Sequence, residues 1–151
     1  MLATHLETEY LINPLGIDIT SPRLSWNDER GIKQTGFRIT YSLNGESKKT
    51  IEVKSSSMHY LLSIPLTSRD KVTWLVSICD EKGNWGPNSE EASFEMGLLL
   101  ASEWKANWIT GNYLPSKKKR YPVDYFKKSF VCSKKVVKAR LYASAKGVYE
   151  A

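Results

Sequence analysis

Neighbouring carboxylates are the residues of this 151-residue sequence best suited to acid–base chemistry. They occur as three pairs, Asp28-Glu29, Asp80-Glu81 and Glu90-Glu91. A general acid and a general base must face one substrate from positions fixed around a cleft. Each pair lies instead in a polar stretch that predicts a turn, where adjacent carboxylates are solvated. We therefore predict that this chain contains no catalytic residue.

The sequence also lacks the residue spacing that metal and cofactor sites require. His5 and His59 are its histidines, and Cys79 and Cys132 do not form a Cys-x-x-Cys pair. The sequence has no glycine-rich phosphate loop, Gly-x-Ser-x-Gly elbow or His-Glu-x-x-His motif. Cys79 falls in a predicted strand with no histidine nearby in sequence, which disfavours a thiolate nucleophile. We expect no metal, no cofactor and two free thiols rather than a disulfide.

Four aromatic residues are candidates for binding a sugar or for packing against another domain: Trp85, Trp104, Trp108 and Tyr113. Aromatic rings stack on the flat C–H faces of sugars, and the same rings bury a large apolar area between domains. Trp104 and Trp108 follow residues 98–102, which are typical of a linker that docks on a neighbour. Interdomain packing is the favoured interpretation, and sugar stacking is the alternative.

The net charge of +6 is divided unevenly along the chain. Residues 1–97 hold ten Lys and Arg against thirteen Asp and Glu, whereas residues 98–151 hold twelve against three. A basic segment can bind nucleic acid or a membrane surface. Here most lysines alternate with apolar residues or lie in the loop 111–122, and no recognition-helix pattern follows. We expect solvated charge with no nucleic acid and no membrane partner, and polyanion binding is the alternative.

Short strands are the elements predicted to carry these residues. Residues 36–43 alternate apolar and polar side chains, Asn44-Gly45 indicates a tight turn, and residues 49–53 return as the partner strand. Further strands are predicted at 23–26, 58–62, 72–79 and 92–96. About six short strands separated by turns predict an all-β, two-sheet sandwich. The aromatic residues expected between the two sheets are Trp26, Tyr41 and Trp74.

A second group of strands is predicted at 125–131, 136–144 and 148–151. Their apolar side chains cannot be buried by two or three strands alone, because such small units are marginal in water. These side chains are Phe126, Phe130, Val137, Leu141 and Val148. We therefore predict a sandwich over 1–97, a linker and loop over 98–122, and the first strands of a truncated second β-sandwich over 123–151. The second part should be less stable than the first.

Six stretches of the sequence carry a resemblance to a known family in their order and spacing. They are Asn13-Pro14-Leu15-Gly16-Ile17-Asp18, Ser21-Pro22-Arg23-Leu24-Ser25-Trp26, Glu95-Met96-Gly97-Leu98-Leu99, Trp104-Lys105-Ala106-Asn107-Trp108-Ile109, Ala139-Arg140-Leu141-Tyr142-Ala143-Ser144 and Gly147-Val148-Tyr149-Glu150. With them the chain resembles the N-terminal region of bacterial α-L-rhamnosidases. The resemblance implies a fibronectin type III-like or immunoglobulin-like domain followed by the start of a second sandwich. It also places the catalytic barrel, with its acid and base, beyond residue 151.

Two functions follow from these observations. The resemblance implies a non-catalytic, domain-packing fragment of a glycosidase that removes terminal α-L-rhamnose with inversion. Its partners would be the remaining domains and a rhamnose-containing glycan, and the exposed edge of the second domain would allow self-association. The alternative is a stand-alone carbohydrate-binding or adhesion module. Residues 1–9 lack the pattern of a secretion leader, and no run of about eighteen apolar residues occurs, so we expect a cytoplasmic protein.

Overall fold

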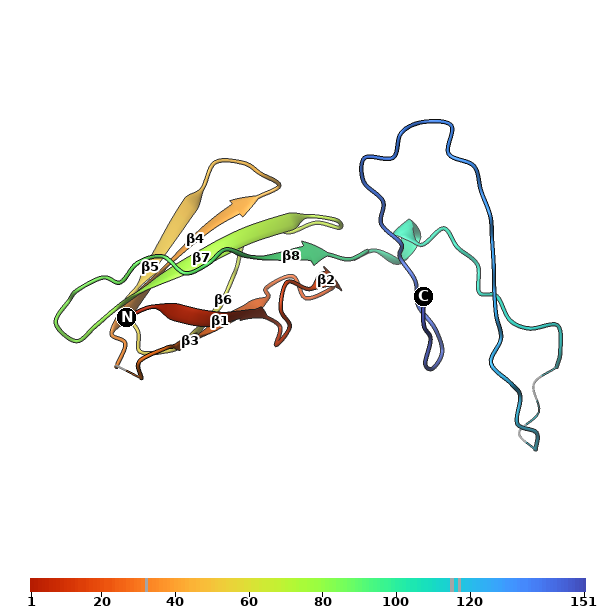
Figure 1. The fold of residues 1–151 in the computed structure, drawn as a ribbon, viewed down its shortest axis with the longest axis horizontal. Helices are drawn as coiled ribbons and strands as arrows, with labels where there is room; N and C mark the ends of the chain where they lie inside the picture. Colours follow the sequence, from red (N-terminus) through yellow and green to blue (C-terminus); the bar gives the residue numbers. More distant parts are fainter. Residues whose placement is uncertain (32, 115, 117) are drawn as a thin grey trace. The chain divides into compact units, whose positions relative to one another are not determined.

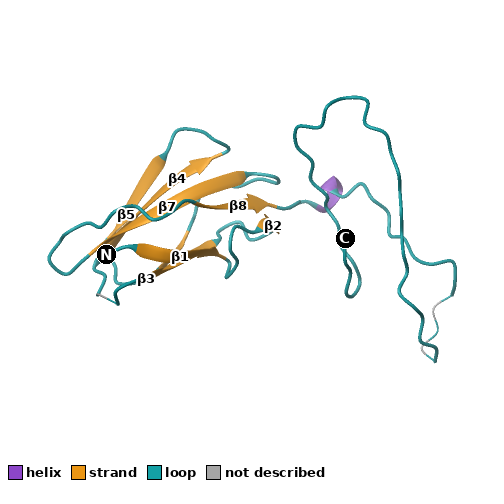
Figure 2. Cartoon of the chain, in the orientation of Figure 1, coloured by secondary structure: helices purple, strands orange, loops and turns teal. Residues whose placement is uncertain are grey.

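The computed structural model describes residues 1–31, 33–114, 116 and 118–151. Its contacts divide the chain into two units, residues 1–103 and residues 104–151. The first unit is a sandwich of two β-sheets (Figure 1), and the colouring by secondary structure shows that strands dominate it (Figure 2). The predicted all-β sandwich is therefore confirmed for the first unit.

Eight strands form the two sheets in the described residues. The smaller sheet has the order β1-β3-β6, from Ala3–Thr8, Arg23–Asp28 and His59–Leu61. The larger sheet has the order β2-β8-β7-β4-β5, from Leu15–Ile17, Ala92–Met96, Lys71–Cys79, Gly36–Leu43 and Lys49–Val53. Neighbouring strands are antiparallel except β2, which runs parallel to β8. A short 3-10 helix, η1 (Ala101–Glu103), follows β8.

Alternating hydrophobicity identified most of these strands. β4, β5 and β8 have the predicted bounds, and β3, β6 and β7 differ from prediction by one or two residues at their ends. The turn after β4 is also confirmed, because Asn44 and Gly45 have positive φ angles of 51° and 80°. β1 and β2 were not predicted. β1 carries a register shift between Thr4 and Glu7 that breaks its alternation, and β2 has three residues.

The three aromatic residues expected between the sheets are buried there. Trp26 belongs to the smaller sheet, and Tyr41 and Trp74 belong to the larger one. The Trp26 ring meets the Phe37 ring edge-on at 4.9 Å between centroids, which is a favoured aromatic geometry. The indole N–H of Trp74 donates to Thr8 Oγ1 across the core at 3.3 Å. The predicted interdigitation is thus confirmed.

Gln34 supplies the hydrogen-bond acceptor that the buried indole of Trp26 needs. Its Oε1 accepts from Trp26 Nε1 at 3.0 Å, and its Nε2 donates to the carbonyl oxygens of Ser55 and Ser57. Gln34 is itself buried, so an unpaired amide here would cost free energy. This side chain therefore ties β3 to the loop between β5 and β6.

The second unit does not contain the predicted strands. Within residues 104–114, 116 and 118–151 the structure assigns no strand, so the predictions for 125–131, 136–144 and 148–151 are wrong for the chain by itself. Strands need partners both for their backbone groups and for their apolar faces. The apolar side chains of this unit are instead exposed, among them Phe126, Phe130 and Val137. The assignment of this region to a second sandwich stays a prediction.

Both cysteines are free, Cys79 buried in β7 and Cys132 exposed. Among the described residues, no helix has the length and hydropathy needed to cross a bilayer.

Replacement of a phenylalanine should distinguish the two units. Phe94→Ala is expected to lower the free energy of unfolding of the sandwich by about 3–5 kcal/mol, because the ring is completely buried. Phe130→Ala removes a ring that is 79% exposed, so it should change the free energy of unfolding by less than about 0.5 kcal/mol. Urea unfolding followed by tryptophan fluorescence measures both. Similar losses for the two variants would show that the second unit has a core of its own.

Candidate domain junction

The sandwich holds the chain firmly where it leaves the last strand. We call residues 97–103, which follow β8, the exit segment. Gly97 N donates to the carbonyl oxygen of Ile17 at 2.7 Å, and its own carbonyl accepts from Arg69 N at 3.2 Å. A Cβ atom at residue 97 would lie 2.9 Å from the carbonyl oxygen of Gly16, so the backbones meet as closely as glycine allows. The first unit thus extends to Glu103, whereas the sequence placed its boundary at Gly97.

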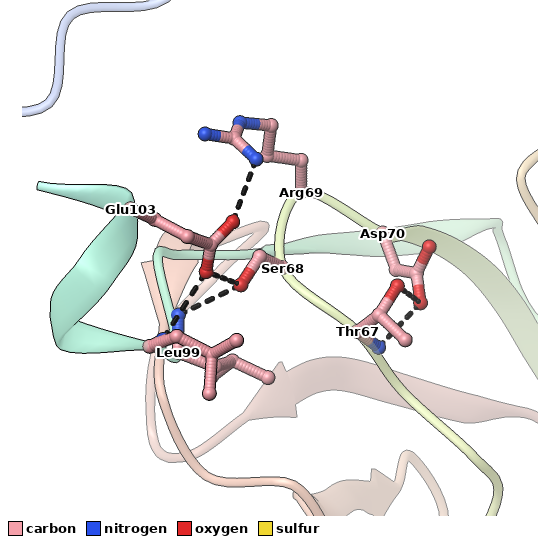
Figure 3. A network of polar contacts seen from close by, with 7 residues as sticks. Thr67, Ser68, Arg69, Asp70, Leu99 and Glu103 are labelled. Atoms are coloured by element: carbon pink, nitrogen blue, oxygen red, sulfur yellow. Dashed lines mark hydrogen bonds and ion pairs between the residues drawn. The ribbon is translucent and has the colours of Figure 1, made fainter.

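A single carboxylate fastens the far end of the exit segment. Glu103 Oε1 accepts from Arg69 Nη1 at 2.8 Å, and Glu103 Oε2 accepts from the Ser68 hydroxyl and from Leu100 N (Figure 3). Ser68 Oγ in turn accepts from Leu99 N at 2.8 Å. We call Ser68, Arg69 and Glu103 the exit clamp. The clamp joins η1 to the turn that precedes β7.

The clamp keeps Glu103 ionised. The hydrogen bond from Ser68 is the main reason that the pKa of Glu103 lies below its usual value, and Leu100 N–H and Arg69 lower it further. These contacts favour the charged carboxylate because each partner donates a hydrogen to it. All of the named donors face one carboxyl group, so Glu103 acts as an attachment point rather than as a proton donor.

A second carboxylate stiffens the turn beneath the clamp. Asp70 Oδ2 accepts from Thr67 N at 2.6 Å and from the Thr67 hydroxyl (Figure 3), and Asp70 Oδ1 accepts from Asn44 Nδ2 at 2.7 Å. Burial raises the pKa of Asp70, but the hydrogen bonds from Asn44 and Thr67 outweigh it and leave this pKa below its usual value. Asn44 Oδ1 also accepts from Lys71 N. The turns at 44–45 and 67–70 are therefore held together.

A shallow depression of about 360 Å³ opens beside the clamp. It is lined by Leu66, Thr67, Ser68, Leu99, Leu100 and Glu103, all from the first unit. Glu103 is the one carboxylate in this lining, whereas acid–base cleavage of a glycosidic bond requires two. The arrangement is suited to receiving apolar side chains.

The predicted carboxylate pairs have local structural roles. Asp80 accepts hydrogen bonds from the backbone of Asn84 and Lys82, and the bonds from Asn84 are the main cause of its lowered pKa. Asp28 caps its own turn by accepting from Arg30 N. Glu91 lies 3.8 Å from the Lys48 ammonium on the surface. Among the residues that the structure describes, no three His, Cys, Asp or Glu side chains gather as a metal site.

Trp85 lies on the first unit and is partly covered. The Arg38 guanidinium stacks over its ring at 3.8 Å from the centroid, and Arg38 Nε pairs with Glu52 at 2.7 Å. A cation over an indole is a favourable contact, and here it occupies one face of the ring. Trp85 therefore packs on its own sheet.

The other three predicted aromatic residues belong to the second unit. Trp104 and Trp108 are exposed, Trp108 to 68%, and the Lys146 ammonium lies 5.4 Å from the Trp108 ring. Tyr113 stacks on Tyr121 at 4.4 Å, and its hydroxyl donates to Asp124 at 2.9 Å, which raises the pKa of Tyr113. Each ring has a different neighbour, and the packing and glycan roles both stay predictions.

Sequence patterns did not identify the clamp. Arg69 and Glu103 are 34 residues apart, and a long-range pair of this kind has no characteristic spacing. Only the local part was detectable, because Thr67 and Asp70 form a typical turn in which a side chain bonds to nearby backbone.

The Leu100 amide offers a direct test of the clamp. Because folding lowers the Glu103 pKa, the clamp is complete above the ordinary carboxyl pKa and is lost as pH falls through the lowered value. The Leu100 amide shift in nitrogen–proton NMR spectra should follow that titration between neutral and acidic pH. Glu103→Gln should abolish the titration and speed exchange of the Leu100 amide, whereas the exposed Glu91→Gln should do neither. A titration at or above the ordinary carboxyl pKa would contradict the clamp.

The chain is similar in sequence to known proteins. Residues 3–100 match the family described as Rha78A-like, N-terminal immunoglobulin domain. An α-L-rhamnosidase of Alteromonas sp. (strain LOR) is 34% identical over 160 residues, which cover 94% of this chain and 17% of that protein. An α-L-rhamnosidase of Formosa agariphila is 34% identical over 173 residues, covering 98% of this chain and 18% of that protein.

A solved structure agrees with these matches. The α-L-rhamnosidase from Dictyoglumus thermophilum superposes with a TM-score of 0.63 at 28% identity, over 72% of this chain and 14% of that one. The chain thus spans less than a fifth of the length of these relatives, and the matched family region ends at residue 100, inside the exit segment. On its sequence match and its fold, the chain belongs to the family of Rha78A-like N-terminal immunoglobulin domains.

Proposed function

We propose that this chain is the N-terminal, non-catalytic part of an α-L-rhamnosidase-like glycoside hydrolase and that its sandwich positions the domains that follow. The observation that carries the proposal is the clamped exit segment. Backbone hydrogen bonds at Gly97 and the Glu103 carboxylate fix the path of the chain as it leaves the sandwich. Support also comes from the family match and from the small share of each relative that the chain spans.

A clamped exit segment and a flexible linker differ in how far they orient the domains that they join. A flexible linker behaves as a random coil, so it tethers two domains without orienting them. Residues 97–103 are instead attached at both ends, by the close approach of Gly97 to Gly16 and by the exit clamp. The sandwich therefore holds residues 97–103 at both ends. Such a domain acts as a buttress for the rest of the enzyme.

The chemistry of the parent enzyme would be supplied by other domains. Inverting hydrolysis of an α-L-rhamnoside needs a general acid and a general base on opposite sides of the scissile bond. The carboxylates of the sandwich described above are engaged in turns, surface pairs and the clamp. We therefore assign the acid, the base and rhamnose recognition to the parent and not to this chain.

Residues 104–151 are best understood as the start of the following domain. Their apolar side chains Phe126, Phe130 and Val137 are exposed. Further strands of a longer protein would pair with their backbone and cover these side chains. This role makes the remaining domains of the parent the principal partner of the chain.

The two free thiols fit a cytoplasmic protein. Disulfides persist in oxidising compartments, and one of the two thiols, Cys132, is exposed. We therefore propose a cytoplasmic location for the protein.

The coding DNA and an activity assay test this function together. We expect the reading frame to continue through several hundred codons beyond Ala151, and we expect the 151-residue chain to release no nitrophenol from 4-nitrophenyl α-L-rhamnoside. The longer product should release it. A stop codon directly after Ala151 would refute the role as the front end of an enzyme. Hydrolysis by the short chain itself would refute the non-catalytic assignment.

Glycan binding is the second candidate, because Trp108 stays 68% exposed. If the chain is a carbohydrate-binding module, added L-rhamnose should protect tryptophan fluorescence from iodide quenching, and Trp108→Ala should remove this protection. Trp85→Ala is the matched control, since Arg38 already covers one face of that ring. Quenching that is unchanged by the sugar would exclude rhamnose stacking and favour packing between domains.

A further inference from the structure

The segment between β1 and β3 exposes an unusual number of apolar side chains. We call these side chains the apolar rim: Tyr10, Leu11, Ile12, Leu15 and Ile19. Ile12 is 73% exposed and Tyr10 is 66% exposed. From residue 10 to residue 19 the sequence contains a single charged residue, Asp18. Clustered apolar exposure of this kind marks an interaction site on a folded domain.

The first part of the rim is held in a fixed conformation. Thr8 and Leu11 exchange backbone hydrogen bonds of 2.9 and 3.0 Å around a two-residue turn, in which Glu9 and Tyr10 have φ angles of 51° and 63°. Positive φ is unfavourable for residues other than glycine, so the surroundings must impose it. Arg23 does so, because its backbone N–H donates to Glu9 Oε1 at 2.6 Å and its guanidinium lies over the Tyr10 ring.

The second part of the rim is fastened to the strand that leads to the exit. Asn13 Oδ1 accepts from Ser93 N at 2.7 Å, and the Pro14 carbonyl accepts from Glu95 N at 3.0 Å. β2, which contains Leu15, then pairs in parallel with β8. Figure 1 shows this red-to-orange segment at the same end of the sandwich as the end of β8. The rim therefore lies at the end of the sandwich where β8 leads into the exit segment.

We infer that the apolar rim is the docking surface for a domain that follows in the parent enzyme, presenting an apolar patch; the inference rests on the proposed function. More than four fifths of the length of each curated relative lies outside the region that this chain matches. A domain tethered through the short, clamped exit segment is present at a high effective concentration near the rim. The depression beside the exit clamp, lined by Leu66, Leu99 and Leu100, adds apolar surface next to the exit segment.

The rigidity of the rim also suits docking. Ordering a loop on binding costs conformational entropy, and a surface that is already ordered avoids this cost. Arg23, Ser93 and β8 hold the rim in place before any partner arrives. The depletion of charge matches the centre of a permanent interface.

Side-chain footprinting of two protein lengths tests this surface. Hydroxyl radicals should oxidise Tyr10, Leu11 and Ile12 several-fold more slowly in the full-length protein than in the 151-residue chain. Met58 is the internal control, because it is exposed and lies outside the rim, where its carbonyl accepts from Trp26 N of β3. Equal oxidation of the rim in the two proteins would overturn the inference while leaving the proposed function intact.

A charge placed on the rim gives the energetic test. Ile12→Asp should lower the melting temperature of the full-length protein and leave that of the 151-residue chain unchanged, because the side chain is exposed there. Ser56→Asp, also exposed, is the matched control in the loop between β5 and β6. No change in the full-length protein, or a dimer of the short chain that Ile12→Asp dissociates, would overturn the inference. A reading frame that stops at Ala151 would refute the proposed function itself and, with it, this inference.

Discussion

The close approach of Gly97 to Gly16 is the constraint on which this end of the sandwich depends. A side chain at residue 97 would force the backbone of residue 16 away, since even a Cβ atom would lie 2.9 Å from its carbonyl oxygen. The hydrogen bond from Gly97 N to Ile17 fixes β2 beside β8, and the Gly97 carbonyl receives the N–H of Arg69. One small residue thereby aligns the edge strand, the turn before β7 and the exit segment.

That alignment explains how Glu103, a partly exposed carboxylate, can hold the exit segment. Glu103 is partly accessible to water, and a single accessible ion pair contributes little to stability. Its partners, however, sit on a turn already fixed by Asp70, Thr67 and Asn44. Holding the clamp together therefore costs little additional entropy. The clamp works as the last member of an ordered network rather than as an isolated salt bridge.

Local patterns predicted the parts of the fold that local physics determines. Alternation gave β4 its correct bounds, and the positive φ values that Asn44-Gly45 tolerates gave the turn and the returning strand β5. β1 was not predicted because its register shift breaks the period of two, and β2 was not predicted because three residues are too few to show a period. The exit clamp was not predicted for another reason. Its members come together only after the sheets have formed, so no sequence spacing marks them.

The second unit shows the converse limit of sequence patterns. Residues 125–131 and 136–144 were predicted as strands, and 136–144 alternate apolar and polar side chains, yet neither segment is a strand in this structure. Alternation specifies which face a strand would bury, whereas hydrogen-bonding partners and a covering surface decide whether the strand forms. The sandwich, by contrast, closes its own core around Trp26 and Trp74 and needs no partner to do so. The first unit thus buries its own core and carries a clamped exit segment and an ordered apolar rim, whereas residues 104–151 leave Phe126, Phe130 and Val137 exposed, and both features agree with the proposed support of following domains.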